Sequence, residues 1–150
     1  MADYAVELVT HDWTRFGEVL DLSYEVLYRP FGVARQDSWY HAAHGSVFAI
    51  AQAADCTLLG TARLLPASDE GSRQVRQVAV GTKARRCGIG HALMAELERV
   101  AADEGVPELW LQARENAFGF YQRLGYVSEG EIFISELTGI PHRTMRKHLK

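Results

Sequence analysis

The stretch that decides the fold is "RRCGIG", residues 85–90, which joins "VRQVAV" (75–80) to "HALMAELERVAADEG" (91–105). Apolar residues alternate in the first run, as in a half-buried strand, and recur at helical spacing in the second. Two arginines and two glycines are costly at such a junction, because like charges repel and glycine weakens regular structure. We therefore expect the junction to bind something.

The physical chemistry of a helix N-terminus indicates the ligand. The first amides have no intrahelical partner and carry a partial positive charge, so they bind anions, above all phosphates. Gly88 and Gly90 let the backbone approach an anion, and Arg85 and Arg86 add charge-assisted hydrogen bonds. A Walker A loop needs Gly-Lys-Ser/Thr, and a dinucleotide fingerprint needs a third glycine and a parallel βαβ unit. A pyrophosphate cradle of another kind is predicted, and a solvated turn is the simpler alternative.

Periodicity elsewhere predicts a chain of mixed α and β structure. Asp12 is expected to cap the first helix, and residues 31–45 are expected to be irregular or to form a short helix. Short turns between the strands of residues 46–80 indicate an antiparallel meander. The predicted strands are 4–9, 46–53, 56–66, 74–80, 108–113, 126–135 and 142–149, and the predicted helices are 13–28, 89–104 and 116–124.

Length and composition favour one globular domain over residues 1–150. The chain is 47% apolar and 23% charged, with a net charge of −3, so no overall field favours nucleic acid or an anionic membrane. Cys56 and Cys87 stand in no metal-ligand spacing, and His41 and His44 lack an evident third ligand, so we expect no metal. No signal peptide and no apolar run of ~18 residues is present. We expect a cytoplasmic protein.

Three motifs resemble those of the GNAT superfamily of N-acetyltransferases. The R-x-x-G-x-G pattern after "QVAV" resembles its acetyl-CoA signature, and "FYQRLGY" (120–126) is similar to its second conserved block. "GEIF" (130–133) and "GIPH" (139–142) are similar to the ElaA-like subgroup, and the order of elements matches over nearly the whole chain. The resemblance implies the GNAT acyl-CoA N-acyltransferase fold: α/β, with a mostly antiparallel sheet, a central parallel pair of splayed strands, and flanking helices.

The resemblance also implies roles for individual residues, with acetyl-CoA as the cosubstrate. Main-chain groups of Val78 and Val80 would pair with the pantetheine arm, and the amides of residues 86–91 would hold the pyrophosphate. Arg114 stands where many members have asparagine, and Gln77 is the nearest polar residue where many have a glutamate base. The predicted coenzyme-binding residues are Val78, Ala79, Val80, Arg85, Arg86, Cys87, Gly88, Ile89, Gly90, His91, Arg114, Asn116 and Phe120.

The expected chemistry is direct attack of a neutral primary amine on the thioester. Tyr121 matches the tyrosine that protonates the departing thiolate, and a core tyrosine is the alternative. His142, Glu131 or a water held by Gln77 would take the amine's proton, and a solvated strand face is the alternative for the first two. A small amine, an aminoglycoside, a peptide N-terminus or a lysine remains open as acceptor, and a homodimer is left open. A non-catalytic acyl-CoA-binding or sensor module is the alternative function.

Overall fold

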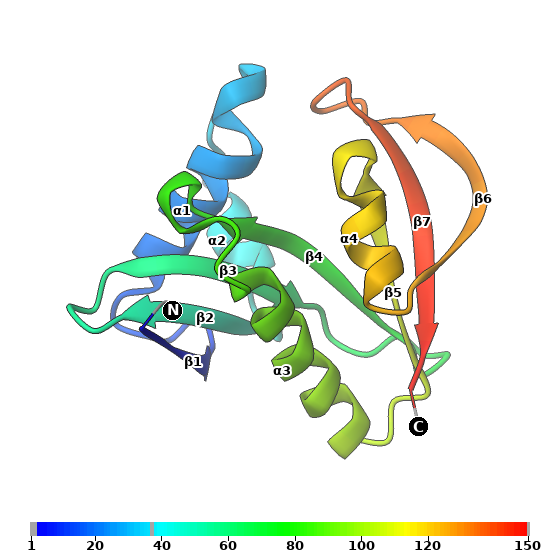
Figure 1. Ribbon diagram of the computed structural model, residues 1–150, viewed down its shortest axis with the longest axis horizontal. Coiled ribbons are helices and arrows are strands. Elements are labelled where there is room, and N and C mark those ends of the chain that lie inside the picture. The colour runs from blue at the N-terminus through cyan, green and yellow to red at the C-terminus, as the bar shows by residue number, and fades with distance from the viewer. Residues whose placement is uncertain (1–2, 37, 150) are drawn as a thin grey trace.

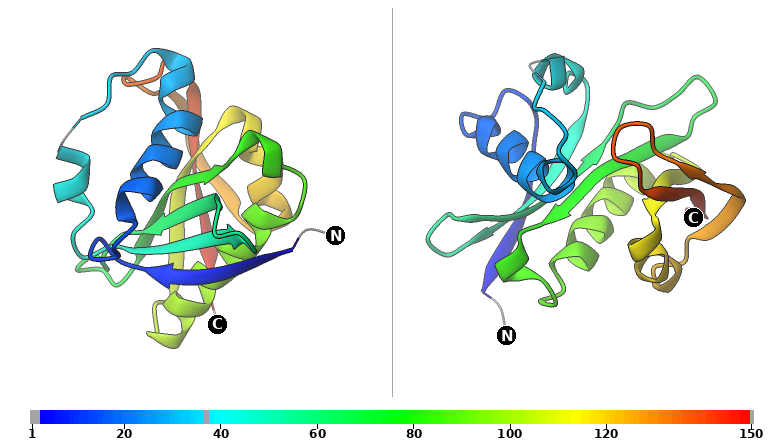
Figure 2. Two further views of the ribbon diagram at one scale, coloured as in Figure 1. Left: turned by 90° about the vertical axis from the view of Figure 1, so that its left-hand side faces the viewer. Right: turned by 90° about the horizontal axis from the view of Figure 1, so that it is seen from above.

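The computed structural model describes residues 3–36 and 38–149, which form a seven-stranded sheet with helices on both faces (Figures 1 and 2). The strand order is β1-β2-β3-β4-β5-β7-β6. Helices α1 and α2 cover one face, and α3 and α4 lie on the other (Figure 2). The elements are β1 (Tyr4–Val9), α1 (Phe16–Leu27), α2 (Ser38–Ala42), β2 (Val47–Ala53), β3 (Leu58–Leu64), β4 (Arg73–Val80), α3 (Ile89–Asp103), β5 (Glu108–Arg114), α4 (Phe118–Arg123), β6 (Val127–Ile134) and β7 (Pro141–His148).

The predicted order of elements and the antiparallel meander β2-β3-β4 are confirmed, while the start of the first helix is corrected. Helix α1 begins at Phe16, not at residue 13, and the residue that precedes it is Arg15, so Asp12 does not cap it. The Trp13 amide instead donates to the Thr10 carbonyl at 3.0 Å, which closes a separate turn. The region 31–45 contains the end of a 3₁₀ turn at Arg29–Phe31 and the short helix α2.

The larger core lies on the α3 and α4 side of the sheet, and a smaller one lies between α1 and β2. Ile89, Leu93 and Leu97 recur every four residues along α3 and are fully buried. Burying side chains of this size contributes roughly 1.5–3 kcal/mol each, which fixes α3 against β2, β3 and β4. Gly105, at φ +76°, follows the last turn of α3 in the left-handed conformation that ends many helices. The position of the residue 85–91 turn therefore follows from the packing of this helix.

Strands β4 and β5 are parallel neighbours that soon separate. They pair only at Arg73 with Leu109 and at Gln74 with Trp110, and Figure 1 shows β4 diverging from β5 beyond that point. On its other side β4 carries a register shift against β3, and Gln77 has the left-handed φ of +54°. A bulge of this kind bends a strand and increases its twist. The predicted splayed pair is therefore present at the centre of the sheet.

Gly60 on β3 is predicted to be essential to this packing, in contrast with Gly17 on α1. A Cβ at Gly60 would lie 2.9 Å from Cγ2 of Ile89 and 3.1 Å from Cδ1 of Leu93, whereas a Cβ at Gly17 would meet nothing within 4 Å. Gly60→Ala should lower the free energy of unfolding by about 1–3 kcal/mol through overpacking. Gly17→Ala should raise it by up to about 1 kcal/mol. Urea unfolding measures both, and equal effects would contradict the assignment.

Candidate functional site

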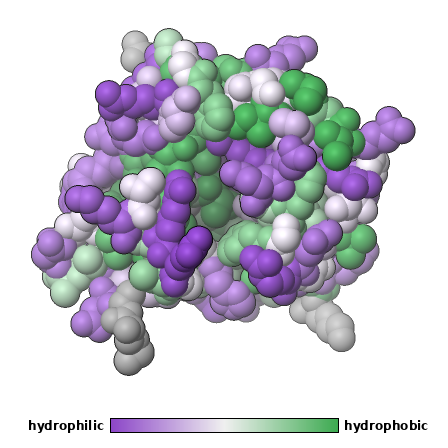
Figure 3. Space-filling view, turned by 45° about the horizontal axis from the view of Figure 1, so that its top comes forward, coloured by the Kyte–Doolittle hydropathy of each residue, from purple (hydrophilic) through white to green (hydrophobic). Residues whose placement is uncertain are grey.

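A cleft of about 1390 Å³ lies where β4 and β5 part. Figure 3 shows the molecule hollowed on this side, with an apolar floor and many hydrophilic side chains around the rim. One wall comes from the end of α1 and the open side of β4, and the other from β5, α4 and the β6–β7 loop. The predicted site residues that line it are Val78, Val80, Arg85, Arg86, Gly88, Ile89, Gly90, His91, Arg114, Asn116, Phe120, Tyr121 and His142.

Part of the main chain of β4 faces this cleft; at Val80 the carbonyl accepts a long hydrogen bond of 3.5 Å from Nε of Arg85. The Gly81 amide donates to the Leu59 carbonyl at 2.8 Å, and Ala79 lies opposite Thr61 on β3. Because the direction of main-chain groups alternates along an antiparallel strand, Ala79 points toward β3 and its neighbours point the other way. The amides and carbonyls of Val78 and Val80 therefore face the gap that β5 has left.

The turn at residues 85–91, here called the anion cradle, has two features of an anion-binding loop: left-handed residues and free helix amides. Arg86 and Gly88 both adopt positive φ, at +68° and +78°, in a turn that curls amides inward. The first amide bonded back to the turn is that of Ala92, which donates to the Gly88 carbonyl at 3.0 Å. The amides of residues 89–91 therefore have no partner inside the 15-residue helix α3.

The two glycines of the cradle have different structural roles, whereas from the sequence both were expected to let the backbone approach an anion. Gly88 supplies the left-handed backbone that ends the turn. A Cβ at Gly90 would lie 3.1 Å from Cζ of Phe120 and 3.9 Å from Cγ2 of Val80. Gly90 therefore allows the Phe120 ring to pack against the start of α3, rather than making room for an anion.

Tyr121 is held by packing and lines the cleft. Its ring stands edge-on to those of Phe120 and Tyr126, at centroid distances of 5.0 Å and 5.8 Å, and only 7% of the residue is exposed. Within residues 3–36 and 38–149, no protein group hydrogen-bonds its hydroxyl. Burial raises the pKa of Tyr121 above its ordinary value, and the Arg114 guanidinium opposes that shift. The side chain therefore stays protonated at neutral pH.

His142 lies on β7, in register with Arg114 of β5 on one side and Phe133 of β6 on the other. Its Nδ1 is 2.8 Å from the Ile140 carbonyl oxygen, and its ring stacks on Phe133 at 5.7 Å between centroids. A carbonyl accepts hydrogen bonds only, so the neutral ring carries its proton on Nδ1. This assignment leaves the lone pair of Nε2 free to accept a proton.

Gln77 is anchored in a polar network on the opposite wall. Arg63 donates to its Oε1 at 3.3 Å, and its Nε2 donates to the Tyr28 hydroxyl at 3.2 Å. The buried Arg63 also donates to Ser46 Oγ at 2.9 Å and to the Ala42 carbonyl. Burial, and then the nearby Arg76, lower the pKa of Arg63. The Gln77 amide cannot take up a proton, so this wall contributes hydrogen bonds rather than a base.

Arg114 crosses the cleft to the end of α1. Its Nη2 donates to the Leu27 carbonyl at 2.6 Å, and its guanidinium carbon lies 5.1 Å from the centroid of the Phe31 ring. The motifs give no indication of this contact, because Leu27 and Arg114 are 87 positions apart. The α1 wall, including Tyr28, was therefore not predicted from the motifs.

Three predicted site residues do not line the cleft. The side chain of Ala79 is buried in the core, and its main chain faces β3. Cys87 is exposed, with its thiol directed to the Arg85 carbonyl at 3.7 Å. Glu131 is exposed on β6, inside the stretch where the pairing with β7 shifts register between Glu129 and Phe133.

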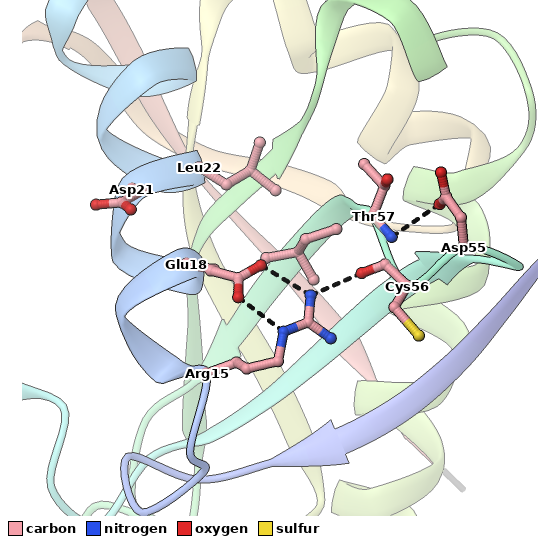
Figure 4. A pocket seen from close by; sticks show the side chains of 8 residues that line it. Arg15, Glu18, Asp21, Leu22, Asp55, Cys56 and Thr57 are labelled. Atoms are coloured by element: carbon pink, nitrogen blue, oxygen red, sulfur yellow. Dashed lines mark hydrogen bonds and ion pairs between the residues drawn. The ribbon is translucent and has the colours of Figure 1, made fainter.

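A second hollow, of about 480 Å³, lies between α1 and the β2–β3 turn (Figure 4). Arg15 fills its centre: it contacts Glu18 at 2.7 Å and donates to the Cys56 carbonyl at 2.6 Å and to Gln52 at 2.7 Å. Its charge and most of its donors are thus already matched by the protein. We interpret these contacts of Arg15 as structural, because they hold the β2–β3 turn against α1.

The described residues place limits on other kinds of site. Among them, no group of three or more His, Cys, Asp or Glu side chains is close enough to hold a metal ion. The side chain of His41, one of the two histidines considered for a metal pair, lies outside the described part of the structure. No helix in the described residues is long and apolar enough to cross a membrane.

Comparison with known proteins identifies the family. A family model described as acetyltransferase (GNAT) matches residues 10–126, so the chain belongs to the GNAT acetyltransferase family. Mycothiol acetyltransferase of Actinosynnema mirum is 37% identical over 103 residues, which are 66% of this chain and 34% of that protein. The matched regions span between 34% and 58% of the curated relatives' own lengths.

Solved structures agree on the fold. An acyl-CoA N-acyltransferase from Pseudomonas aeruginosa superimposes with a TM-score of 0.82 at 24% identity, over 97% of this chain and 99% of that one. Escherichia coli ElaA superimposes with a TM-score of 0.79 at 19% identity, over 96% and 99% of the two chains. At these identities the likeness concerns the fold alone, and it confirms the expected GNAT architecture.

Burial of Tyr121 predicts a loss of stability at alkaline pH. Its folded-state pKa lies above the value of about 10 in the unfolded chain, so its contribution is complete below pH ~10 and is lost as pH rises further. Tyr121→Phe should therefore make the free energy of unfolding fall less steeply above pH ~10, by up to about 1.4 kcal/mol per pH unit. Urea titrations at several alkaline pH values measure this, and identical slopes would contradict it.

Proposed function

We propose that the protein transfers the acetyl group of acetyl-CoA to a primary amine. The observation that carries this proposal is the open edge of β4, which shares one cleft with the anion cradle. An extended pantetheine arm can pair with the main-chain groups of Val78 and Val80 that face the gap, as an added strand would. The pyrophosphate can bind the amides of residues 89–91, with Arg85 and Arg86 beside them. Membership of the GNAT family supports an acyl-CoA donor.

The proposed chemistry is a direct transfer through a tetrahedral intermediate. The amine nitrogen attacks the thioester carbon and forms the C–N bond, while the main-chain amide of Val78 or Val80 stabilises the oxyanion. The C–S bond then breaks, and the CoA sulfur takes the hydroxyl proton of Tyr121. The proton that the amine loses passes to Nε2 of His142. The products are an N-acetyl amine and free CoA.

His142 is preferred to Glu131 as the base for a geometric reason. His142 lines the cleft with an imidazole whose tautomer is fixed by the Ile140 carbonyl, whereas Glu131 is exposed outside it. The alternative, a binding or sensor module, needs the cradle but neither acid nor base. The presence of Tyr121 and His142 on the same cleft favours the enzyme.

The cradle can be tested by comparing two ligands. Arg85→Ala/Arg86→Ala should weaken the binding of CoA, because two charge-assisted contacts to phosphate are lost, each worth roughly 1.5–3 kcal/mol. Binding of pantetheine, which has no phosphate, should be unchanged in calorimetry. Arg99→Ala, on the exposed side of α3 with Glu96 and Asp103 as partners, is the matched control. Wild-type protein that binds pantetheine as tightly as CoA would refute the cradle.

Turnover tests the acid and the base together. Free-thiol release from acetyl-CoA should appear with at least one class of primary amine. Tyr121→Phe should lower kcat about 10²-fold, the lower end for a general acid because a thiolate leaves readily, with little change in acetyl-CoA affinity. His142→Gln should lower kcat/KM and flatten the acidic limb of its pH profile, apart from the portion due to protonation of the amine itself.

Glu131→Gln is the comparison for the base and should keep the wild-type profile. The same loss in Glu131→Gln and His142→Gln would contradict the assignment of His142. CoA binding without thiol release from any amine would contradict the transferase and favour the sensor module.

A further inference from the structure

The acceptor end of the cleft holds a cation that the protein does not neutralise. Arg114 is half-buried, and one of its donors is used by the Leu27 carbonyl at 2.6 Å. No carboxylate within residues 3–36 and 38–149 forms an ion pair with it. Glu136 supplies the sole carboxylate among the described residues that line the cleft, and it is exposed on the β6–β7 loop. A guanidinium stays charged in a protein and has five N–H donors. Arg114 therefore has free N–H donors and a positive charge with which it can bind an anionic group of a ligand.

The surroundings of Arg114 contain a second free donor. The Tyr28 hydroxyl accepts a hydrogen bond from Nε2 of Gln77 at 3.2 Å, so its own proton is directed elsewhere. Tyr28 lies close enough to influence the electrostatics of Arg114, and both residues line the cleft. A guanidinium and a hydroxyl proton that face the same space form a typical pair of donors for a carboxylate.

The proposed base belongs to the strand next to that of Arg114 and lines the same cleft. Arg114 and His142 are directly opposite each other in the antiparallel pair β5–β7. Side chains at such positions project from the same face of the sheet, with Cβ atoms roughly 4.5–5.5 Å apart. The Arg114 side chain then reaches across the cleft to Leu27, so a small ligand bound between the guanidinium and the sheet would lie on the same side as the His142 ring.

We propose that the acceptor is a small amine with a carboxylate next to its amino group, as in a free α-amino acid. Arg114 and the Tyr28 hydroxyl bind the carboxylate, and His142 takes the proton from the neighbouring amine. This inference rests on the proposed acetyl transfer. A lysine side chain or a peptide N-terminus has no carboxylate in that position, and would leave a half-buried guanidinium unpaired in the filled cleft. A site built for a polar group rejects analogues that lack it.

Matched acceptors test the assignment on the wild-type protein. Free-thiol release should be measured for phenylalanine, methionine and alanine, for their carboxamides, and for the three corresponding decarboxylated amines. We expect at least one amino acid to exceed its carboxamide and its amine about 10- to 100-fold in kcat/KM, the range for hydrogen bonds to a charged group. The carboxamide has the more acidic ammonium, so more of its amine is free at neutral pH. The comparison with the carboxamide is therefore biased against the proposal, and it is the one that decides.

The arginine is tested by a matched pair of variants. Arg114→Gln should remove most of the preference for the amino acid, measured as the ratio of its kcat/KM to that of the carboxamide in the same variant, so that a general effect on the cleft cancels. Arg143→Gln is the control, because Arg143 is next to His142 on β7, also donates to a main-chain carbonyl, that of Gly130 at 3.1 Å, and does not line the cleft. The control should keep the preference. An equal loss for all acceptors in Arg114→Gln would mean that the residue only braces the cleft, and would overturn the proposal.

Product inhibition of the wild-type enzyme tests the acceptor assignment without relying on the folding of Arg114→Gln. The N-acetyl amino acid should inhibit the wild-type enzyme at least 10-fold better than its carboxamide. Thiol release without any preference for the carboxylate would overturn the acceptor assignment and leave the transferase standing. Thiol release from no acceptor would overturn the transferase, and the acceptor assignment would fall with it.

Discussion

Two neighbouring strands that pair for only two residues are the constraint on which the rest of this molecule depends. Strands β4 and β5 are bonded at Arg73–Leu109 and Gln74–Trp110, and beyond that point the bulge at Gln77 turns β4 away. Buried main-chain groups need partners, so an open strand edge inside a protein requires water or a ligand. Here the main-chain groups that need partners form an extended row, because they follow the strand. The interruption of the sheet thus sets the shape of any ligand that pairs with this edge of β4.

The same contacts that stabilise the fold also position the anion cradle. Ile89, the first residue of α3, packs where Gly60 lacks a side chain, and Gly90 accommodates the ring of Phe120 from α4. The helix start is therefore held from both sides of the gap between the strands. Its free amides point at a fixed place relative to the open edge of β4. Glycines at two positions make this possible, because a Cβ at Gly60 would press on Ile89 and a Cβ at Gly90 would press on the Phe120 ring.

Sequence patterns predicted the elements that have a local cause. Helix α3, the meander β2–β4 and the turn at residues 85–90 follow from periodicity and from glycine and arginine placed together. The capping role of Asp12 was wrong because a separate turn from Thr10 to Trp13 competes for the same residues. Contacts such as Arg114 with Leu27 depend on tertiary packing across 87 positions. Spacing rules do not reveal such contacts, and the α1 wall of the cleft was therefore not predicted.

The residue at position 77 explains why the base would belong to the opposite wall. A glutamate there would stand against Arg63, and this ion pair would depress its pKa and weaken it as a base. Glutamine keeps the hydrogen bonds to Arg63 and Tyr28 without the negative charge. Arg63, behind Gln77, and Arg114, in the cleft, then have no carboxylate partner among the described residues, while a neutral imidazole at His142 could accept a proton without adding an anion. The neutral Gln77 side chain thus leaves the cleft positively charged, and it leaves the role of proton acceptor to a residue on the opposite wall.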